Sequence, residues 1–560
     1  MTGADAILKS LKENGIDYLF VNAGSDFAPI IESYAAAEEL SAFPEPLIIP
    51  HECVAVGMAH GFYLATGRPQ GIMVHVHVGL ANAVMGVINA RADNVPMVVI
   101  SGRTPLTEHG RLGARATAIQ YGQEMFDQTA LVRDVTKFNY ELRYAEQASA
   151  LVNRAVSIAK SEPAGPVYLS LPREPLAEEV PDGHSTQKLI QAAPGVPQPD
   201  EGMIKQAAAL LAQASNPLMI VQRGDAAGQV GKFVGRMAAR HAIKIVESGG
   251  QRSVVAGDHP MRIPGKVNPH LPEADVVLVV DASVPWIERH TRPNPDATVI
   301  HIGPDPLFSN MPMRSYKTDL AIVGNTAATV SAISAELDML EPETGERYAT
   351  IEAEHKRAMG ALRDKAQAGN TAPMSADWVG LCLSESLPDD ALVFSERGPK
   401  IAKMILGENH KYFANTWAGG LGWGVPAAIG AQLVDRERLV VSIVGDGSYM
   451  FGNPVACHQV METYDLPVLT IVLNNKRWNA VHFSTLEVYP DGAASKGALA
   501  PLSDLSASPD FVKIAEASRT YAERVENGAD LPAALERAIQ VIKTEKRAAL
   551  LEISVNNEMT

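Results

Sequence analysis

The sequence contains few cysteines, and the three present, Cys53, Cys382 and Cys457, lie far apart along the chain. This scarcity excludes a disulfide-rich framework, and the spacing excludes the paired cysteines of a structural zinc site. The N-terminal segment has the pattern of an amphipathic helix leading into a strand, without the apolar region of a signal peptide. We therefore expect a cytoplasmic protein from a reducing compartment.

Positive charge and long apolar runs are also scarce. The chain has 48 Lys and Arg residues against 64 Asp and Glu residues, a formal net charge of −16. A nucleic-acid-binding surface needs a basic patch, and a membrane helix needs about 20 consecutive apolar residues. We accordingly expect neither a nucleic-acid partner nor a membrane partner. An acidic ligand would have to be bound locally by a metal ion, a helix end or a single basic residue.

Short apolar runs rich in β-branched residues recur throughout the 560 residues and alternate with helical patterns. Typical runs are DYLFVNAG, VPMVVISGR, ADVVLVVDAS and RLVVSIVGDG. Short buried strands that alternate with helices predict parallel sheets covered on both faces. The predicted fold class is therefore α/β with mainly parallel sheets.

Two breaks in this alternation divide the chain into three segments of similar size. The first is the stretch from Glu178 to Pro199, rich in proline, glycine and polar residues, and the second ends near Pro373 after a charged helical pattern. Such stretches are typical of linkers between domains. We predict three Rossmann-like domains, which span residues 1–180, 195–345 and 370–560.

The segment Val441–Trp478 places polar groups after two strand-like runs. Asp446 follows LVVSIVG and Asn475 follows PVLTIVLN, while Gly445 and Gly447 leave room for close backbone approach. Ligands of parallel sheets bind beyond the carboxyl ends of the strands, and carboxylate and amide oxygens suit Mg²⁺. Each piece alone is equally typical of a turn. Together, with room for one helix and one strand between them, they favour a metal-anchored diphosphate site.

This segment resembles the cofactor motif of thiamine-diphosphate-dependent enzymes, which begins with Gly-Asp-Gly and ends in Asn-Asn. The stretches AGGLGWGVPAAIGAQL, PHECVAVGMAHGFYLATGRP and VGLANAVMGVINARADNVPMVVISG are similar to the branch that contains acetolactate synthase and benzoylformate decarboxylase. The resemblance covers all three segments and implies the thiamine-diphosphate-binding fold. It also implies thiamine diphosphate and Mg²⁺ as cofactors.

The resemblance implies a role for each motif residue. Glu52 matches the glutamate that engages the aminopyrimidine ring of the cofactor, although a carboxylate at a helix start is an alternative reading. Leu421 matches the bulky residue beneath the bent cofactor, and it is equally consistent with an ordinary core leucine. Asp446 and Asn475 would ligate Mg²⁺ through their side chains and Arg477 through its backbone carbonyl. The residues that would place backbone donors near the diphosphate are Gly445, Gly447 and Ser448.

Four further residues are candidates for the substrate side. Ser25 and His75 match positions where benzoylformate decarboxylase has a serine and a histidine facing the substrate, and Gln123 resembles the active-site glutamine of acetolactate synthase. His482 faces the substrate or caps local structure. His75 and His77 alternate along an expected strand, so a metal pair is conceivable, although no third ligand is visible.

The resemblance implies a lyase or carboligase that decarboxylates a 2-oxo acid and then protonates the product or joins it to a second carbonyl compound. The alternatives are a 2-hydroxyacyl-CoA lyase or related acyl-CoA enzyme, and a catalytically silent nucleotide-binding regulatory protein. The central segment lacks a dinucleotide fingerprint, so we do not expect FAD. Pro285 and Trp286 in this segment line the cleft or pack the domain. The family further implies a homodimer or homotetramer with active sites between chains.

Overall fold

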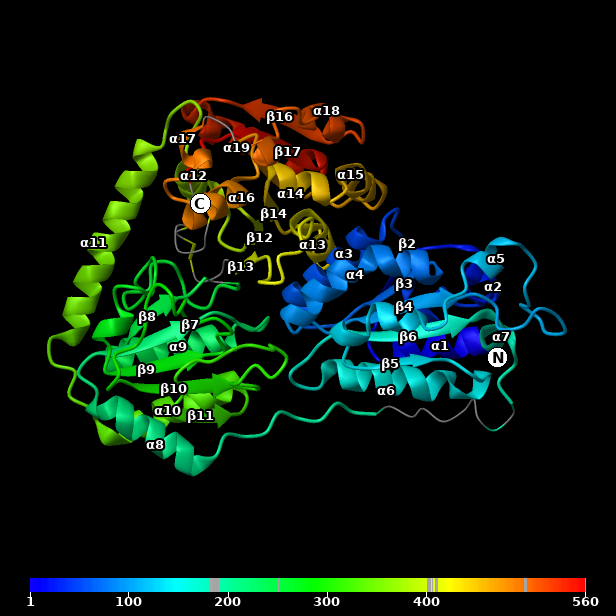
Figure 1. Cartoon of the computed structure of the whole chain (residues 1–560), viewed down its shortest axis with the longest axis horizontal. Helices are drawn as coiled ribbons and strands as arrows, with labels where there is room; N and C mark the ends of the chain where they lie inside the picture. Colours follow the sequence, from blue (N-terminus) through cyan, green and yellow to red (C-terminus); the bar gives the residue numbers. More distant parts are fainter. Residues whose placement is uncertain are drawn as a thin grey trace. The chain divides into compact units, whose positions relative to one another are not determined.

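Three parallel β-sheets with flanking helices make up the protein, described here by a computed structural model (Figure 1). Every strand in each sheet runs parallel to its neighbours, which confirms the predicted α/β class. Among the described residues, none of the helices has the length and apolar character needed to cross a membrane. The structure describes all residues except 182, 184–190, 250, 400–403, 405, 408–410, 498–500 and 559–560.

The N-terminal sheet has six strands in the order β2-β1-β3-β4-β6-β5. Its strands are β1 (Tyr18–Asn22), β2 (Glu45–Ile48), β3 (Gly71–Val74), β4 (Val98–Arg103), β5 (Asn139–Glu141) and β6 (Val167–Pro172). The accompanying helices are α1 (Gly3–Glu13), α2 (Ala28–Ala36), α3 (Glu52–Thr66), α4 (Val76–Ala92), α5 (Ile119–Gly122), α6 (Ala148–Lys160) and α7 (Arg173–Ala177). A capping box between Thr2 and Asp5 starts α1, whose apolar side is buried as its sequence pattern predicts.

Two helices from the C-terminal part of the sequence pack in the same compact unit as this sheet. The unit comprises residues 1–195, 415–436 and 450–466, so it includes α13 (Gly424–Gln432) and α15 (Pro454–Thr463). Every residue of α13 is buried. Glycines bring α13 and α3 into close contact: a Cβ on Gly61 would lie 1.8 Å from the carbonyl oxygen of Ala427. On α3 itself apolar side chains are buried nearly all round, because it lies between the sheet and α13.

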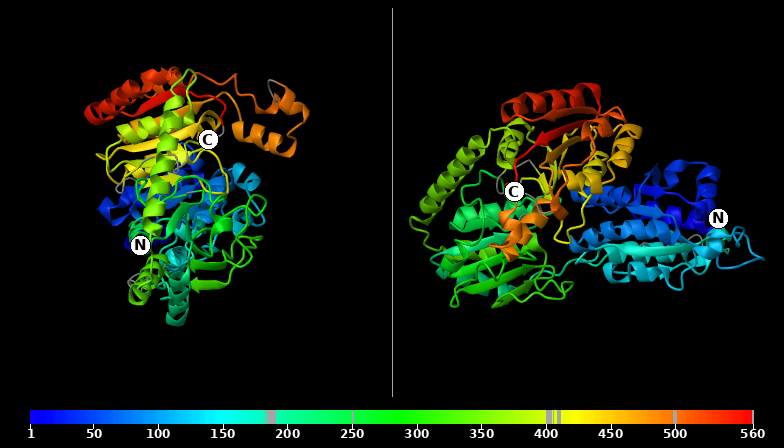
Figure 2. Two further views of the ribbon diagram at one scale, coloured as in Figure 1. Left: turned by 90° about the vertical axis from the view of Figure 1, so that its left-hand side faces the viewer. Right: turned by 45° about the horizontal axis from the view of Figure 1, so that its top comes forward.

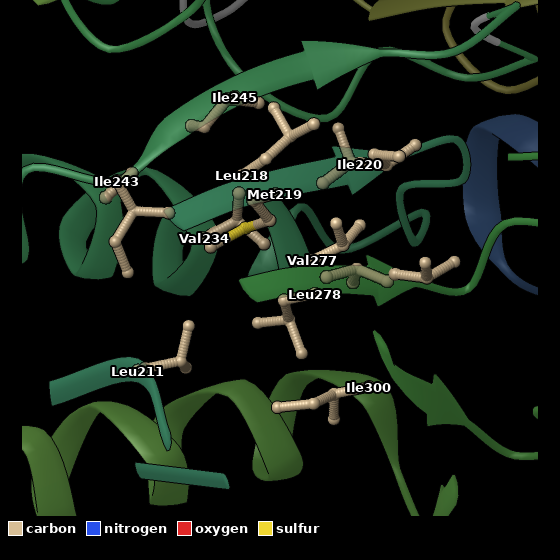
Figure 3. Close-up of a cluster of buried hydrophobic side chains, with 14 of the residues drawn as sticks. Leu211, Leu218, Met219, Ile220, Val234, Ile243, Ile245, Val277, Leu278 and Ile300 are labelled. Carbon is tan, nitrogen blue, oxygen red and sulfur yellow. The ribbon is translucent and has the colours of Figure 1, made fainter. Parts of the chain in front are cut away.

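The second compact unit comprises residues 196–414, 437–449 and 467–560 and holds the other two sheets. The central sheet has the order β11-β10-β9-β7-β8. Its apolar core, part of which Figure 3 shows, has Leu278 and Ile300 on two of the strands and Leu211 on a covering helix. The elements here are α8 (Glu201–Gln213), β7 (Pro217–Val221), α9 (Gln229–His241), β8 (Lys244–Glu247), β9 (Val276–Val280), β10 (Thr298–Gly303), β11 (Leu320–Val323) and α10 (Thr326–Leu340).

Trp286 packs inside this central core. Its side chain is 1% exposed, and its ring meets Tyr316 edge to face at 4.9 Å. The indole N–H donates a hydrogen bond of 2.7 Å to Glu288. Of the two roles that the sequence left open for Trp286, the structure therefore supports packing of the domain.

The C-terminal sheet has six strands in the order β13-β12-β14-β15-β17-β16. Its elements are α12 (Ala376–Ser386), β12 (Leu392–Glu396), β13 (Lys411–Ala414), β14 (Val440–Gly445), α14 (Asp446–Phe451), β15 (Leu469–Asn474), α16 (Asn479–Val488), α17 (Ala493–Lys496), α18 (Phe511–Glu516), β16 (Tyr521–Val525), α19 (Leu531–Glu545) and β17 (Ala549–Ser554). The paired strands β14 and β15 align Gly445 with Leu473, so both end at the same edge of the sheet.

The long helix α11 (Arg347–Ala368) connects the central and C-terminal sheets along the chain, as both views in Figure 2 show. Most of its side chains are at least partly exposed, and His355 is one of the few that are buried. The His355 Nδ1 lies 2.6 Å from the carbonyl oxygen of Arg262 in the central domain. The segment after β8 also contacts the edge strand β13, because the N–H of Ser253 donates to the carbonyl of Tyr412 at 2.8 Å.

Candidate active site

The carboxyl ends of four neighbouring strands bring the predicted residues of the N-terminal segment together. β2, β1, β3 and β4 are adjacent in the sheet. Ser25 follows β1, Glu52 follows β2 and His75 follows β3, while Gln123 lies in the long connection after β4. Because all four strands are parallel, the polar residues that follow them lie along the same edge of the sheet.

Glu52 is the first residue of α3 and is buried, with 6% of its surface exposed. The side-chain amide of Asn82, on α4, donates a hydrogen bond of 3.1 Å to the Oε2 of Glu52. The other oxygen, Oε1, lies 3.1 Å from the position of a Cβ added to Gly79. A buried carboxylate with one neutral partner retains acceptor capacity for a ligand. The helix-start position and a ligand-binding role are thus both compatible with Glu52.

His75 has a partner at each ring nitrogen. Its Nδ1 lies 2.5 Å from Oδ1 of Asp26, and its Nε2 lies 3.1 Å from the side-chain nitrogen of Gln123. The hydrogen bond to Asp26 raises the pKa of His75 above its usual value, burial opposes this shift, and the charges of Asp26 and Glu52 add to it. The hydrogen bond to Asp26 therefore favours the protonated form of His75 relative to a free histidine. Asp26 was not among the residues singled out from the sequence.

The expected alternation of His75 and His77 along a strand is wrong. β3 ends at Val74, His75 precedes α4, and His77 lies within the first turn of that helix. The reason is the backbone of Val76, whose φ of +31° ends the extended conformation directly after His75. The described residues contain no group of three or more His, Cys, Asp or Glu arranged to hold a metal ion.

A network of ion pairs holds the connection that carries Gln123. Glu124 accepts a hydrogen bond of 2.6 Å from Arg103, at the end of β4, and also pairs with Arg115. The hydroxyl of Thr104 donates to the same carboxylate at 2.5 Å. Both arginine side chains are only 13% exposed, so solvent screens these pairs less than surface pairs. The network fixes the backbone next to Gln123, and sequence reasoning missed it because its partners, 9 to 21 residues from Glu124, follow no helical or strand spacing.

Ser25 and His482 lie outside the hydrogen bonds described so far. Ser25 is exposed at the first residue of a 3₁₀ turn, and its carbonyl accepts a 3.3 Å hydrogen bond from Arg173. His482 is half-buried on α16, in the other compact unit. The structure therefore brings His75, Gln123 and Asp26 into one hydrogen-bonded group, and among the described residues of this unit Ser25 is not part of that group.

Leu421 lies in a loop that Asn89 holds in place. Asn89 is 2% exposed on α4. Its side-chain nitrogen donates to the carbonyl of Gly420 at 2.9 Å, while its oxygen accepts from the N–H of Gly420 at 3.2 Å and from the hydroxyl of Thr416 at 3.4 Å. A single amide thus satisfies both backbone groups of the residue before Leu421, which is itself half-buried.

In the second compact unit, Asp446 begins α14 directly after β14. Its carboxyl group is 3% exposed, and burial raises its pKa to about 6 against the opposing backbone N–H groups of Gly447, Lys476 and Arg477. Oδ1 accepts a 2.8 Å hydrogen bond from the N–H of Gly447, whereas Oδ2 is buried and has no hydrogen-bond partner among the described residues. A buried, charged carboxylate oxygen that accepts no hydrogen bond destabilises the fold unless a cation binds it. The oxygen therefore fits the Mg²⁺ ligand that the sequence predicts.

The two asparagines at the end of β15, Asn474 and Asn475, differ in the number of hydrogen bonds that their side chains form. The Asn474 amide donates to Glu552 at 2.8 Å, and its oxygen accepts from Lys476. Within the part of the chain that the structure describes, the Asn475 oxygen accepts one hydrogen bond, of 3.0 Å, from the N–H of Arg477. The side-chain oxygen of Asn475 can therefore also bind a metal ion. This fits the expectation that the second asparagine of the motif, and not the first, is the Mg²⁺ ligand.

The remaining predicted cofactor residues surround Asp446. Gly445 ends β14, and Ser448 is buried within α14. A Cβ on Gly447 would lie 2.1 Å from the Trp478 ring, so only glycine fits there. The chemistry that these residues favour is binding of a hard cation and its phosphate ligands. In the segment ERGPKIAKM after β12, residues 400–403 lie outside the described residues.

Comparison with known protein families identifies three consecutive matches along the chain. Residues 1–131 match the N-terminal TPP binding domain of thiamine pyrophosphate enzymes, residues 204–333 match the central domain and residues 401–553 match the C-terminal TPP binding domain. The chain belongs to the thiamine pyrophosphate enzyme family. Thiamine pyrophosphate is thiamine diphosphate, so the family predicted from the Gly-Asp-Gly and Asn-Asn motif is confirmed.

Relatives within the family include both kinds of enzyme named for the branch above. The chain is 25% identical to a probable acetolactate synthase large subunit of Methanocaldococcus jannaschii, over 96% of this chain and 90% of the relative. It is 26% identical to benzoylformate decarboxylase of Pseudomonas aeruginosa, over 86% of this chain and 87% of the relative. A Rhodococcus jostii thiamine diphosphate-dependent 4-hydroxybenzoylformate decarboxylase shares the fold, with a TM-score of 0.77 at 22% identity and complete coverage of both chains.

Proposed function

We propose that this thiamine pyrophosphate enzyme is a lyase or carboligase that cleaves the bond next to the carbonyl group of a 2-oxo acid. The observation that carries the proposal is the buried Glu52 carboxylate at the strand ends, together with His75, whose pKa is raised by its hydrogen bond to Asp26 and by the charges of Asp26 and Glu52. The relatives named as acetolactate synthase and benzoylformate decarboxylase add support, since both names describe 2-oxo acid chemistry. The 4-hydroxybenzoylformate decarboxylase supports the fold alone.

The binding roles follow from the positions of the side chains. Glu52 would hold the aminopyrimidine ring by a charge-assisted hydrogen bond. Leu421 would support the cofactor from its loop. The buried Oδ2 of Asp446, the side-chain oxygen of Asn475 and the backbone carbonyl of Arg477 would bind Mg²⁺. The groups that would approach the diphosphate are Gly445, Gly447 and Ser448.

Thiamine diphosphate, when bound, would supply a carbon nucleophile and an electron sink for cleavage of the C–C bond next to the substrate carbonyl. The protein moves the protons. His75 holds or accepts a proton at Nε2, and Gln123 orients that nitrogen from 3.1 Å. Ser25, which is exposed and lies outside the hydrogen-bonded group of His75, Gln123 and Asp26, would contribute a hydroxyl group toward the substrate.

We further propose that the active form is a homodimer or homotetramer with Mg²⁺ bound. The connection after β4, which carries Gln123, exposes several large apolar side chains. Clusters of this kind are typical of contacts between subunits. These side chains are Leu106, Leu112, Ile119, Tyr121 and Phe126.

The test is proton NMR of the purified protein with thiamine diphosphate and Mg²⁺, offered pyruvate, benzoylformate or longer 2-oxo acids with and without an aldehyde acceptor. We expect cofactor-dependent consumption of one of these acids, and we expect Glu52→Gln to retain cofactor binding but to lose at least about tenfold in rate. Sedimentation of the active sample reads out the oligomer. Absence of turnover with every acid, despite tight cofactor binding, would reject the proposal and direct the search to acyl-CoA substrates.

A further inference from the structure

Asp26 has a role that neither the sequence motifs nor the family match assigns. We propose that Asp26 is a positioning residue that fixes the tautomer of His75, so that Nε2 is the ring atom that takes up and releases protons. The inference rests on the proposed function only for the statement that His75 faces the substrate. The tautomer is a property of this chain, and it is measurable without turnover.

Both oxygens of the Asp26 carboxylate are engaged. Oδ1 lies 2.5 Å from Nδ1 of His75, and Oδ2 accepts a hydrogen bond of 3.1 Å from the N–H of Val76. The side chain is 3% exposed, so water does not compete for these contacts. An ionised carboxylate only accepts hydrogen bonds, and the Nδ1 of His75 must therefore carry a hydrogen. The lone pair of the neutral ring then resides on Nε2.

The backbone around the pair is shaped to hold it. Val76 has a φ of +31°, a strained conformation for a β-branched residue, and its N–H is the group bound by Asp26. A Cβ on Gly24 would lie 2.0 Å from Nδ1 of His75, and a Cβ on Gly102 would lie 1.8 Å from Oδ2 of Asp26. Two glycines and one strained residue thus make room for a single hydrogen-bonding arrangement.

Gln123 matches this tautomer at the opposite side of the ring. Its amide nitrogen lies 3.1 Å from Nε2, so an N–H donates to the lone pair of the neutral histidine. When Nε2 takes up a proton, the ring becomes a donor there, and the Gln123 amide must rotate by a half turn to present its oxygen. The charges of Asp26 and Glu52 favour this protonated state, while burial disfavours it. Return of the proton to the product restores the neutral ring and closes the cycle.

The measurement is NMR of the protein carrying ¹⁵N- and ¹³C-labelled histidine, with thiamine diphosphate and Mg²⁺ bound, in which His75→Gln identifies the His75 signal. For the unsubstituted protein we expect the Nδ1–H tautomer and a pKa above 6.5. Asp26→Asn presents one acceptor and one donor. Its oxygen is expected to stay with the buried N–H of Val76, which turns the amide nitrogen toward Nδ1 and drives His75 to the Nε2–H tautomer. The pKa of His75 should fall, because the hydrogen bond to the Asp26 carboxylate is the largest cause of its raised value.

A matched control is Asp17→Asn, which removes the same charge from a partly exposed ion pair with Arg68 and should leave His75 unchanged. In the pH profile of turnover, the limb due to His75 should move by the same amount as the pKa measured by NMR. An Nε2–H tautomer in the unsubstituted protein, or an unaltered His75 in folded Asp26→Asn, overturns the inference even if turnover is normal. A protein that consumes no 2-oxo acid refutes the proposed function, and the NMR result still decides the role of Asp26.

Discussion

The chemistry of the N-terminal site depends on residues that act through others. Glu52, His75 and Gln123 were predicted because their residue types and positions match a known pattern. Asp26 and Asn82 were not predicted, although they bind two of these side chains directly. Their partners are 49 and 30 residues away in the chain, and a contact at that distance leaves no periodic signal in the sequence.

At the residue scale, we predict that Gly102→Ala disrupts the hydrogen-bonded group of Asp26, His75 and Gln123, although the added methyl group meets Asp26 and not His75. The added methyl carbon would lie 1.8 Å from Oδ2 of Asp26, so the carboxylate must move. We expect destabilisation of about 1–3 kcal/mol, typical of overpacking, and a loss of activity of at least about tenfold. Denaturant unfolding and turnover assays measure the two effects. The control is Gly360→Ala, in open space on α11, which should leave activity unchanged; equal losses in both variants would contradict the assignment.

At the scale of elements, α4 performs two tasks with its two ends. Its first turn follows His75, and its C-terminal part carries Asn89, which holds the loop of Leu421. The strands and most helices could be predicted, because apolar runs bounded by glycine and proline mark them clearly. The start of α4 could not, since the alternating sequence VHVHV is typical of a strand. The backbone φ of Val76 and its hydrogen bond to Asp26, neither of which is visible in the sequence, account for the start of the helix at this point.

We predict that Asn89→Ala weakens cofactor binding more than it changes the fold of the sheet. The substitution leaves the N–H and carbonyl of Gly420 without the side chain that binds both, so the Leu421 loop loses its fixed position. We expect the Kd for thiamine diphosphate to rise about tenfold, with retained secondary structure. Isothermal titration calorimetry and circular dichroism measure these quantities. Unchanged affinity in the folded variant would show that the loop does not support the cofactor.

At the scale of the whole molecule, both compact units contain histidines that burial keeps neutral. Burial lowers the pKa of His458, in the first unit, and of His301, in the second, to about 4. In unfolded chains these groups titrate near 6.5, so below that pH the unfolded state binds more protons than the folded state. Their contribution to stability is complete above pH 6.5 and is lost progressively as the pH falls toward 4.

We therefore predict that stability decreases between pH 7 and pH 5, by up to about 1.4 kcal/mol per pH unit for each histidine below pH 6.5. His458→Gln should reduce this pH dependence, whereas substitution of the exposed His109 should not. Urea unfolding midpoints at several pH values provide the measurement. Equal midpoints for the unsubstituted protein at pH 7 and pH 5 would rule out a stabilising role for the neutral histidines.

The membership of α13 and α15 in the first compact unit has a consequence for synthesis on the ribosome. The N-terminal sheet is complete once residue 172 has been made, yet the unit that contains it ends only at residue 466. Until α13 has also been made, at residue 432, the apolar surface of α3 that α13 covers has no partner from this helix. From residue 172 to residue 432, an interval of 260 residues, the growing chain therefore contains an incomplete unit with an uncovered apolar surface, and such surfaces are prone to aggregation and are bound by chaperones.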